Sequence, residues 1–296
     1  MNNVKVVSSF NPDQEANRIF AEKYSIPLAA QSYDELLGEC DSVYIASPYA
    51  THYAYCKQAL QAGKNVLCET PFVIKEAEAK ELYDIAEKMR VTLMVALKTA
   101  YCPAFGHLFS LLKSGVIGEI VEINTSSTTL LSEGDYLPQG GRYGGSMVEN
   151  GCFTMLPIFK FFGVDYNNIN FYSKEQQDVD VFTKAVFRYE HAVASFQVGL
   201  GVKTEGNLVI SGTKGYVYVP APWWKTDYFE VRYEDQNQNK KYFYPFIGEG
   251  LRYEIKDFVT AALSKEYKSS RLTKSEVLCM VKAQEQFVKG INKFIL

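Results

Sequence analysis

The sequence predicts an α/β protein of two domains, and three observations support this prediction. Over the first 118 residues, short apolar runs alternate with helical patterns, which indicates β-α-β units and a parallel sheet. The rest of the chain contains many short strands separated by polar turns, as an antiparallel sheet does. A length of 296 residues with 47% hydrophobic residues suits two moderate domains, each with a core. We therefore expect a parallel-sheet domain over residues 1–118 and an α+β domain over residues 119–296.

The first domain contains four predicted strands, each followed by a helical pattern. The strands are Val4–Ser8, Ser42–Ala46, Asn65–Cys68 and Val91–Ala96. The helices follow Pro12 and Ser32 and lie over residues 52–62, 75–89 and 103–114. Asn11 suits the cap of the first helix, and Pro12 suits its first turn. The short links indicate that the strands lie parallel in one sheet.

The second domain begins with a strand and a glycine-bearing loop and then becomes rich in strands. A helix is predicted over 148–162, between the loop and the later strands. The strands are 121–125, 181–187, 193–198, 208–210, 216–219, 228–231 and 242–244. Two helices, Tyr253–Leu263 and Lys274–Phe294, close the chain. The alternating pattern with frequent turns predicts that the sheet is antiparallel.

The composition excludes several classes of protein. A net charge of -3 and a pI near 5.8 give no basic surface for nucleic acid or anionic membranes. No apolar run approaches the roughly 20 residues that span a bilayer, and the start lacks the apolar core of a signal peptide. Six scattered cysteines without a C-x-x-C pair indicate reduced thiols in a cytoplasmic protein. With three histidines, we expect no metal site.

Several short motifs, taken in order, resemble those of one known family. They are Ala46-Ser47-Pro48, His52, the run Ala62–Pro71, Gly144-Gly145 before Glu149-Asn150-Gly151, Ser211–Gly215 and Tyr253-Glu254. The run A-G-K-x-V-L-C-E-x-P is the specific one. Together the motifs are similar to those of the Gfo/Idh/MocA family of NAD(P)-dependent oxidoreductases. The resemblance extends from Val4 nearly to Leu296.

This resemblance implies a fold, a cofactor and a class of substrate. It implies a Rossmann-type parallel-sheet domain and an open-faced antiparallel-sheet domain, through which members often form homo-oligomers. NAD or NADP is the implied cofactor, and hydride transfer usually takes place at a carbinol carbon of a sugar, an inositol or a related polyol. The positions that the resemblance places beside the cofactor are Ser9, Ser47, Pro48, His52, Glu69 and Thr70.

The first departure from the family pattern lies at the start of the chain. The family opens with a strand, a G-x-G-x-x-G turn and a helix, whereas this sequence begins where the second strand is expected. A glycine turn lets the pyrophosphate of the cofactor reach N–H groups at a helix N-terminus. Its absence argues against tight NAD or NADP binding and predicts an incomplete Rossmann-type sheet.

The missing unit removes the strand that normally separates the strand at Val4–Ser8 from the strand at Ser42–Ala46. Three alternatives restore the lost backbone partners. The two strands pair directly, another segment fills the slot, or the natural chain starts roughly 30 residues upstream of this one. A start assigned to an internal methionine and a truly shortened domain are weighed evenly.

The second and third departures remove the usual acid-base groups. Thr70 stands where the family motif E-K-P has a lysine, and a threonine hydroxyl has no useful pKa near 7. Thr70 is expected to be a turn residue before Pro71, where an X-Pro bond admits the cis form. In the helix after Gly144-Gly145, Glu149 and Phe153 replace an Asp and a His. Glu149 is either a solvated acid at the start of this helix or a ligand-binding group.

One segment offers a replacement for the lost lysine. Lys98 follows the strand Val91–Ala96, at the sheet edge where open α/β sheets bind ligands. We hypothesise a relocated polar site of Lys98 and Glu149 as catalytic groups, with Tyr101 at the substrate. Lys98 is otherwise a solvated surface residue. Arg142 and Tyr143, in the loop before Gly144, are expected to contact the substrate.

Two functional hypotheses follow. The first is an oxidoreductase of this family, with NAD or NADP as cofactor and a sugar-like ligand, whose chemistry is impaired by the altered positions. The second is a non-catalytic relative that binds a small molecule or another protein. Loss of the glycine turn, of the lysine and of the histidine favours the second hypothesis.

Overall fold

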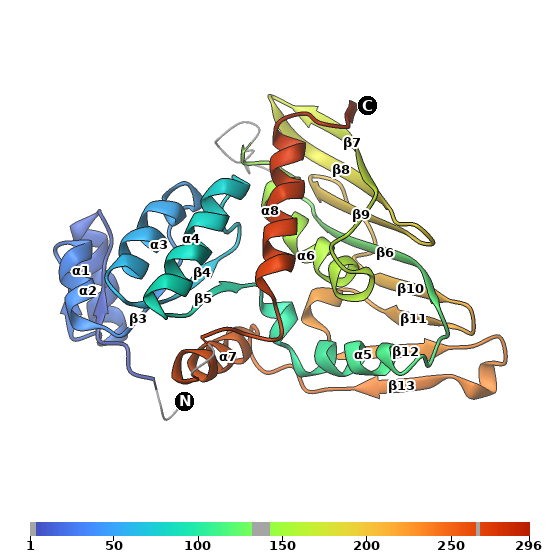
Figure 1. The fold of residues 1–296 in the computed structure, drawn as a ribbon, viewed down its shortest axis with the longest axis horizontal. Helices are drawn as coiled ribbons and strands as arrows, with labels where there is room; N and C mark the ends of the chain where they lie inside the picture. Colours follow the sequence, from blue (N-terminus) through green and yellow to red (C-terminus); the bar gives the residue numbers. More distant parts are fainter. Residues whose placement is uncertain (1–3, 132–142, 265–266) are drawn as a thin grey trace.

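The computed structural model describes residues 4–131, 143–264 and 267–296. Within these residues, a two-stranded and a three-stranded parallel sheet form one end of the molecule, and a nine-stranded sheet forms the other. Two helices, α6 (Ser146–Phe162) and α8 (Lys274–Val288), lie between these ends (Figure 1). The mixture of helices with parallel sheets confirms the predicted α/β class.

The N-terminal part alternates short strands with helices. Its strands are β1 (Ser8–Ser9), β2 (Leu28–Ala29), β3 (Ser42–Ile45), β4 (Asn65–Glu69) and β5 (Leu93–Ala96). Its helices are α1 (Gln14–Tyr24), α2 (Tyr33–Glu39), α3 (His52–Gln61) and α4 (Glu76–Met89), with 3-10 turns η1 (Tyr49–Thr51) and η2 (Lys98–Tyr101). Strands β3, β4 and β5 pair in parallel in that order. Strand β5 is buried along its whole length, although it is an edge strand of this sheet, because the elements packed around it cover it.

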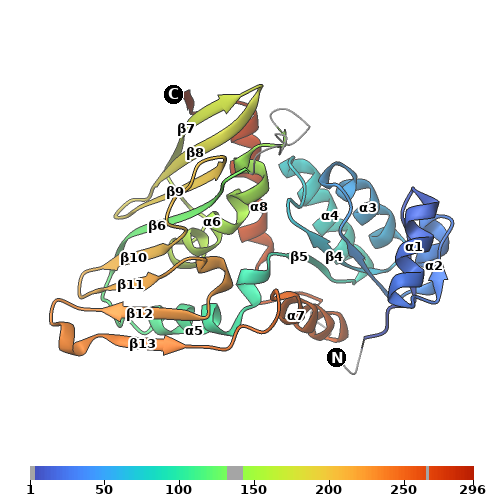
Figure 2. The same cartoon turned by 180° about the vertical axis from the view of Figure 1, so that it is seen from behind.

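Strands β1 and β3 do not share a sheet. Strand β1 pairs with β2, whereas β3 pairs with β4, so direct pairing of the two predicted strands is contradicted among the described residues. Figure 2 shows α1 and α2 with the β1–β2 pair at the outer end of the molecule. Tyr44 of β3 stays 47% exposed. The Rossmann-type sheet is thus incomplete, as the sequence predicted.

The first strand and the first helix differ in their bounds from the prediction. Residues 4–7 are not in a strand, and Val4 and Val6 are exposed. Asp13, not Asn11, caps α1, because its carboxylate accepts a hydrogen bond from the backbone nitrogen of Ala16 at 3.0 Å. Asn11 accepts from the backbone nitrogen of Asp13 at 2.9 Å and so shapes the turn before the helix.

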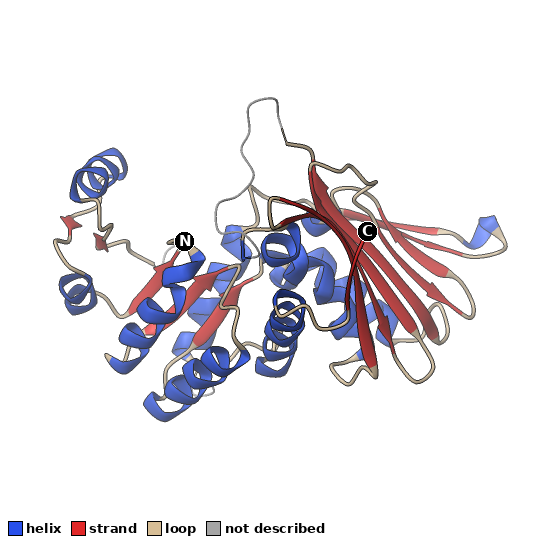
Figure 3. Ribbon diagram, turned by 90° about the horizontal axis from the view of Figure 1, so that it is seen from above, coloured by secondary structure: helices blue, strands red, loops and turns tan. Residues whose placement is uncertain are grey.

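The C-terminal part is built on the nine-stranded sheet. Its strands are β6 (Ile120–Thr129), β7 (Asn168–Gln176), β8 (Val179–Arg188), β9 (Val193–Leu200), β10 (Leu208–Gly212), β11 (Tyr216–Val219), β12 (Tyr228–Arg232), β13 (Lys240–Phe243) and β14 (Lys293–Ile295). Helices α5 (Pro103–Lys113) and α7 (Leu251–Leu263) and the short turns η4 (Trp223–Lys225) and η5 (Gln236–Gln238) complete it. Viewed from above, the larger helices lie on one side of this sheet (Figure 3).

The large sheet is mixed, not purely antiparallel as predicted. Strand β6 pairs in parallel with β9, and β14 pairs in parallel with β7. Helix α8 ends at Val288 instead of continuing to Phe294, because the chain turns at Gly290 with φ of 74° and returns as β14. Both parallel pairs join segments that are far apart in sequence, which local patterns do not reveal.

A buried carboxylate fixes the start of α6. Asp180 of β8 accepts hydrogen bonds from the Ser146 hydroxyl at 2.6 Å and from the Met147 backbone nitrogen at 2.8 Å. Gly145 makes this contact possible, since a Cβ built on it would lie 1.8 Å from Asp180 Oδ1. The Gly144-Gly145 motif therefore positions the helix that carries Glu149. Asp180 supplies from another strand the cap that the helix lacks in its own sequence.

Replacing Gly145 with Ala is expected to destabilise the protein by about 1–3 kcal/mol, because the new methyl group overlaps Asp180. The matched control is Gly38→Ala. Gly38 lies in helix α2 with open space around it, so alanine there should stabilise by roughly 0.5–1 kcal/mol. Urea unfolding of both variants measures the difference, and equal stability of the two would contradict this role of Gly145.

Candidate ligand site at the carboxyl edge of the parallel sheet

The predicted ligand crevice lies where β3, β4 and β5 end side by side. Ser47 follows β3, Glu69 and Thr70 end β4, and Lys98 follows β5. Open α/β sheets bind ligands at the carboxyl ends of their strands. The polar residues that the sequence singled out thus share one edge, but they divide between its two faces.

His52 connects the loops that follow β3 and β4. Its Nδ1 lies 2.9 Å from the carbonyl oxygen of Pro71, and its Nε2 lies 2.7 Å from the carbonyl oxygen of Ser47. The side chain is 1% exposed. Both ring nitrogens are engaged by backbone, so His52 shapes the crevice and presents no free nitrogen to a ligand.

Hydroxyl groups order the loop after β3. The Ser47 and Thr51 hydroxyls lie 2.7 Å apart, and Thr51 donates to the carbonyl oxygen of Pro48 at 2.7 Å. This loop leads into η1 and α3, so its backbone is held on both sides. Ser47 and Pro48 therefore lie at the edge at which the resemblance places the cofactor.

Thr70 faces helix α6. It precedes a cis Pro71, and its side chain lies beside the buried thiol of Cys152. Burial is the main cause that raises the pKa of Cys152 to about 12, so this thiol stays protonated. Thr70 is thus packed between the sheet and α6.

Glu69 points the other way, toward β3 and α7. The Tyr44 hydroxyl donates a hydrogen bond to the carboxylate of Glu69. Burial, and then Glu69 itself, raises the pKa of Tyr44, which keeps this hydroxyl a donor. Because successive side chains of a strand point to opposite faces, Glu69 and Thr70 serve different surroundings.

Glu254 is the acid that sequence reasoning did not select as a site residue. It lies in the first turn of α7, is 1% exposed, and neither carboxyl oxygen has a hydrogen-bond partner among the described residues. Burial, with a further contribution from Glu69, raises its pKa to about 8, while Lys98 acts in the opposite direction. The signal in the sequence was the pair Tyr253-Glu254, which served only as a mark of the family.

Lys98 lies beside Glu254, on the Glu69 side of the edge. Its stem passes the start of α7, where a Cβ built on Gly250 would lie 3.7 Å from Lys98 Cδ. The hydroxyl of the next residue, Thr99, donates to the carbonyl oxygen of Trp224 at 2.8 Å. This bond anchors η2 to η4, the turn between β11 and β12 of the nine-stranded sheet. Lys98 is half-buried, so it is neither a core residue nor a fully solvated one.

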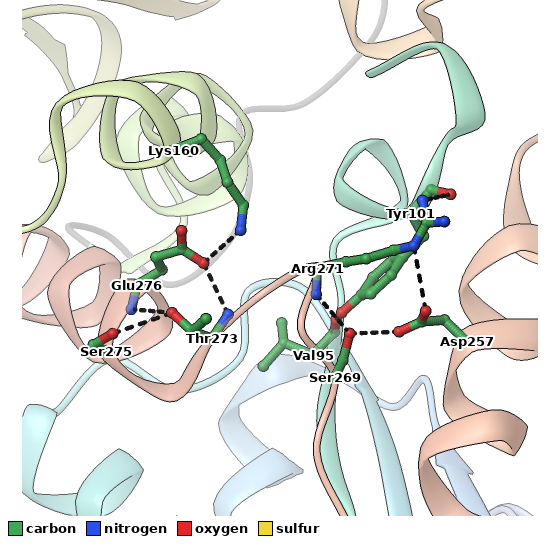
Figure 4. Close-up of polar contacts among 9 residues, drawn as sticks. All are labelled: Val95, Tyr101, Lys160, Asp257, Ser269, Arg271, Thr273, Ser275 and Glu276. Atoms are coloured by element: carbon green, nitrogen blue, oxygen red, sulfur yellow. Dashed lines mark hydrogen bonds and ion pairs between the residues drawn. The ribbon is translucent and has the colours of Figure 1, made fainter. Parts of the chain in front are cut away.

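Tyr101 lies in the core at the end of η2. It is 2% exposed, and its hydroxyl donates to the carbonyl oxygen of Val95 at 2.8 Å. Arg271 donates to the Tyr101 carbonyl oxygen at 3.3 Å and pairs with Asp257 of α7 at 3.4 Å (Figure 4). These contacts join α7 to η2, so Tyr101 supports the edge from within.

Glu149 belongs to a second group of residues, on the α6 side. Burial raises its pKa, and Glu149 and Tyr143 both contribute, after burial, to the raised pKa of Tyr49. Tyr143 is 42% exposed, and Arg142 lies outside the described residues. The predicted grouping of Lys98, Glu149 and Tyr101 is therefore divided: Glu149 is near Tyr49, and Lys98 is near Glu254.

Ser9 lies on β1, in the other parallel sheet. Its hydroxyl donates to the amide oxygen of Asn17 at 2.8 Å, and the amide nitrogen of Asn17 donates to the Ala30 carbonyl oxygen at 3.0 Å. Asn17 is buried, so this network joins β1, α1 and the end of β2. In the described parts of the chain, Ser9 thus contributes to folding of its own unit.

The described residues contain neither a metal-binding cluster nor a membrane-spanning helix. No cluster of three or more His, Cys, Asp or Glu side chains suited to a metal ion occurs in residues 4–131, 143–264 and 267–296. No helix within these ranges is long and apolar enough to cross a membrane.

Comparisons with known proteins agree with this architecture. Residues 1–97 match the model of GFO_IDH_MocA, "Oxidoreductase family, NAD-binding Rossmann fold". A trans-1,2-dihydrobenzene-1,2-diol dehydrogenase from Bos taurus is 27% identical over 301 residues, covering 97% of this chain and 90% of the relative. The Homo sapiens protein of the same name is 27% identical over 304 residues, with coverage of 97% and 90%.

Two solved structures share the fold over nearly the whole chain. Levoglucosan dehydrogenase in complex with NADH and levoglucosan superposes with a TM-score of 0.84 at 18% identity, covering 97% of this chain and 88% of that one. KijD10, a 3-ketoreductase from Actinomadura kijaniata in complex with NADP and TDP-benzene, gives 0.82 at 21% identity, with coverage of 99% and 91%. These likenesses establish the two-part fold.

The titration of Glu254 predicts a pH dependence of stability. An acid whose pKa is about 8 when folded and 4.5 in its unperturbed state binds its proton more tightly in the folded protein. Its contribution to stability is complete below pH 4.5 and is lost as the pH rises to about 8. The loss between these limits is expected to be roughly 2–4 kcal/mol.

Glu254→Gln is expected to remove most of this pH-dependent loss of stability, because glutamine resembles the protonated acid and does not ionise. Urea unfolding at pH 5 and pH 8.5 measures it. Glu249→Gln is the control, since burial is absent there and Lys225 lowers the pKa of Glu249, so its titration lies below this window. An unchanged loss of stability in Glu254→Gln would show that Glu254 is already ionised at neutral pH.

Proposed function

This chain belongs to the Gfo/Idh/MocA family of oxidoreductases, and from this premise we propose that it binds a nicotinamide nucleotide and a sugar-like or polyol ligand at the carboxyl edge of β3, β4 and β5. The family match over residues 1–97 supports this proposal. So do the relatives, since levoglucosan dehydrogenase was solved with NADH and levoglucosan, and KijD10 with NADP. The observation that carries the proposal is the alignment of Ser47, Glu69, Thr70 and Lys98 along that edge.

The described residues fit the nicotinamide riboside of such a cofactor better than its pyrophosphate. Ser47, Thr51 and Glu69 offer hydroxyl and carboxylate groups, which suit the hydroxyl and amide groups of a nicotinamide riboside. For the pyrophosphate, the N-terminus of α1 already holds the carboxylate of Asp13, a charge that opposes phosphate. We therefore propose that affinity comes from the nicotinamide half and is modest.

The proton that accompanies oxidation of a carbinol needs an acceptor from the protein, because the nicotinamide carries only the hydride. Thr70 does not accept it, and Phe153 has no titratable group. Glu149 and Lys98 remain as the catalytic candidates, one on each face of the edge. We propose low turnover by one of these groups.

One observation favours the second candidate function, a non-catalytic relative. The Thr70 side chain lies beside the buried Cys152 thiol of α6, so the position of the usual lysine faces this helix. A protein that only binds its ligand has no need of an acid-base group there. In this alternative, the crevice holds the same sugar-like ligand without turnover.

Titration with NADH and NADPH should quench the fluorescence of Trp224, whose carbonyl oxygen is bonded to Thr99 beside Lys98. We expect saturable binding with a Kd of about 0.1–1 mM, which corresponds to roughly 4–5 kcal/mol. AMP is the control, because it lacks the nicotinamide half. Equal binding of AMP and NADH, or no saturation at ~5 mM, would exclude this cofactor assignment.

Thr70→Lys is expected to raise turnover of a polyol substrate by about 10²-fold or more, because it restores an ammonium at the crevice. Thr70→Met is the matched control, with similar length and no charge. Oxidation of a panel of sugars and polyols, followed by NADH absorbance, measures the effect. If Thr70→Lys is no faster than Thr70→Met, the acid-base deficit does not lie at this position.

A further inference from the structure

A buried acid and a half-buried amine meet where η2 packs against the first turn of α7. Glu254 is 1% exposed, and both of its carboxyl oxygens have no hydrogen-bond partner among the described residues. Leaving a buried carboxyl group without a partner is costly, so the group either keeps its proton or pairs with a cation. Lys98 is the cation that acts on it.

The surroundings of Glu254 include charged and titratable groups from every packed element. They are Tyr44 of β3, Glu69 of β4, Lys98 and Tyr101 of η2, and Cys102 just after η2. Glu249, just before α7, lies near Lys98. Of these, Lys98 alone carries a positive charge. Glu69 accepts from Tyr44, and Glu249 pairs with Lys225 at 2.6 Å. Lys98 therefore is the only group in this set that can neutralise Glu254.

The backbone and the aliphatic stem of Lys98 contact neighbouring residues, whereas its ammonium group has no ion-pair partner among the described residues. The Cys102 thiol donates to the Lys98 carbonyl oxygen at 3.3 Å, and Lys98 Cδ lies near Gly250 of the α7 cap. Within the described residues, the Lys98 ammonium makes no ion pair within the 4.0 Å that defines one, in contrast with Lys225. The Lys98 ammonium is therefore available to pair with a neighbouring carboxylate.

We propose that Glu254 is a positioning residue for Lys98, which it draws toward the Glu69 side of the crevice edge as an ion pair. This inference rests on the proposed function, in which Lys98 is an acid-base group for a carbinol. The ionised carboxylate of Glu254 holds the ammonium inward, and the protonated carboxyl group releases it. The same pair thus decides when the crevice has a basic group.

A purely structural Glu254 would support α7 without affecting Lys98, so the test measures the amine itself. Lys98 is labelled with trace acetic anhydride, and the rate is read by mass spectrometry, in the absence of nucleotide. Lys256 of the same helix is exposed and serves as the internal reference. At pH 9, Glu254→Gln is expected to accelerate labelling of Lys98 about threefold or more relative to Lys256.

Two control variants and a pH profile of the unaltered protein complete the experiment. Glu254→Asp should restore slow labelling, and Glu249→Gln should change the Lys98 rate by less than half as much, since Glu249 is exposed and paired with Lys225. Equal Lys98 rates in Glu254→Gln and the unaltered protein would overturn the proposal. If the variant does not fold, the unaltered protein decides: its Lys98 rate should show a second inflection near pH 8, and a single titration curve overturns the inference.

The two experiments distinguish a failure of the proposed function from a failure of the Glu254–Lys98 pairing. The nucleotide titration with NADH and AMP tests cofactor binding, and the labelling experiment needs no nucleotide. Accelerated labelling without nucleotide binding would support the pairing and refute the cofactor assignment. Nucleotide binding with unchanged labelling would refute the pairing alone.

Discussion

The imidazole of His52 is the contact on which the geometry of the crevice depends. It bridges the carbonyl oxygens of Ser47 and Pro71 and thereby fixes the loop after β3 against the loop after β4. With that loop fixed, the two-residue period of a strand directs Glu69 to one face and Thr70 to the other. Backbone geometry alone therefore places the Glu69 carboxylate and the Thr70 hydroxyl on opposite faces of the edge.

This division explains how the protein tolerates Thr70 where a lysine is usual. An ammonium beside the buried Cys152 thiol and the α6 surface would need a partner for its charge, whereas the neutral hydroxyl of Thr70 does not. On the opposite face, burial and then Glu69 raise the pKa of Glu254, and each of these two carboxyl groups favours a nearby cation when it is ionised. The electrostatics of the chain thus place a positive group on the Lys98 side.

The sequence predicted the edge well and the grouping at the edge poorly. Motifs at strand ends were sufficient to locate Ser47, Glu69 and Thr70, because a strand end is a local feature. The grouping of Lys98 with Glu149 was not confirmed, since it depends on which face α6 and α7 cover, and those helices lie far along the chain. Glu254 escaped selection for the same reason: its burial depends on how α7 packs against η2 and its surroundings, which lie far away in the sequence.

The separation of β1 from β3 adds a constraint on any nucleotide. In a complete sheet, one ligand spans strands that share backbone hydrogen bonds, so its two halves are held by one rigid edge. Here the β1–β2 pair has its own network around Asn17 and no ladder to β3 among the described residues. Contacts made at β1 thus cost additional ordering of one unit against the other. In the proposed assignment, affinity therefore comes mainly from the carboxyl edge of β3, β4 and β5, whose loops His52 joins.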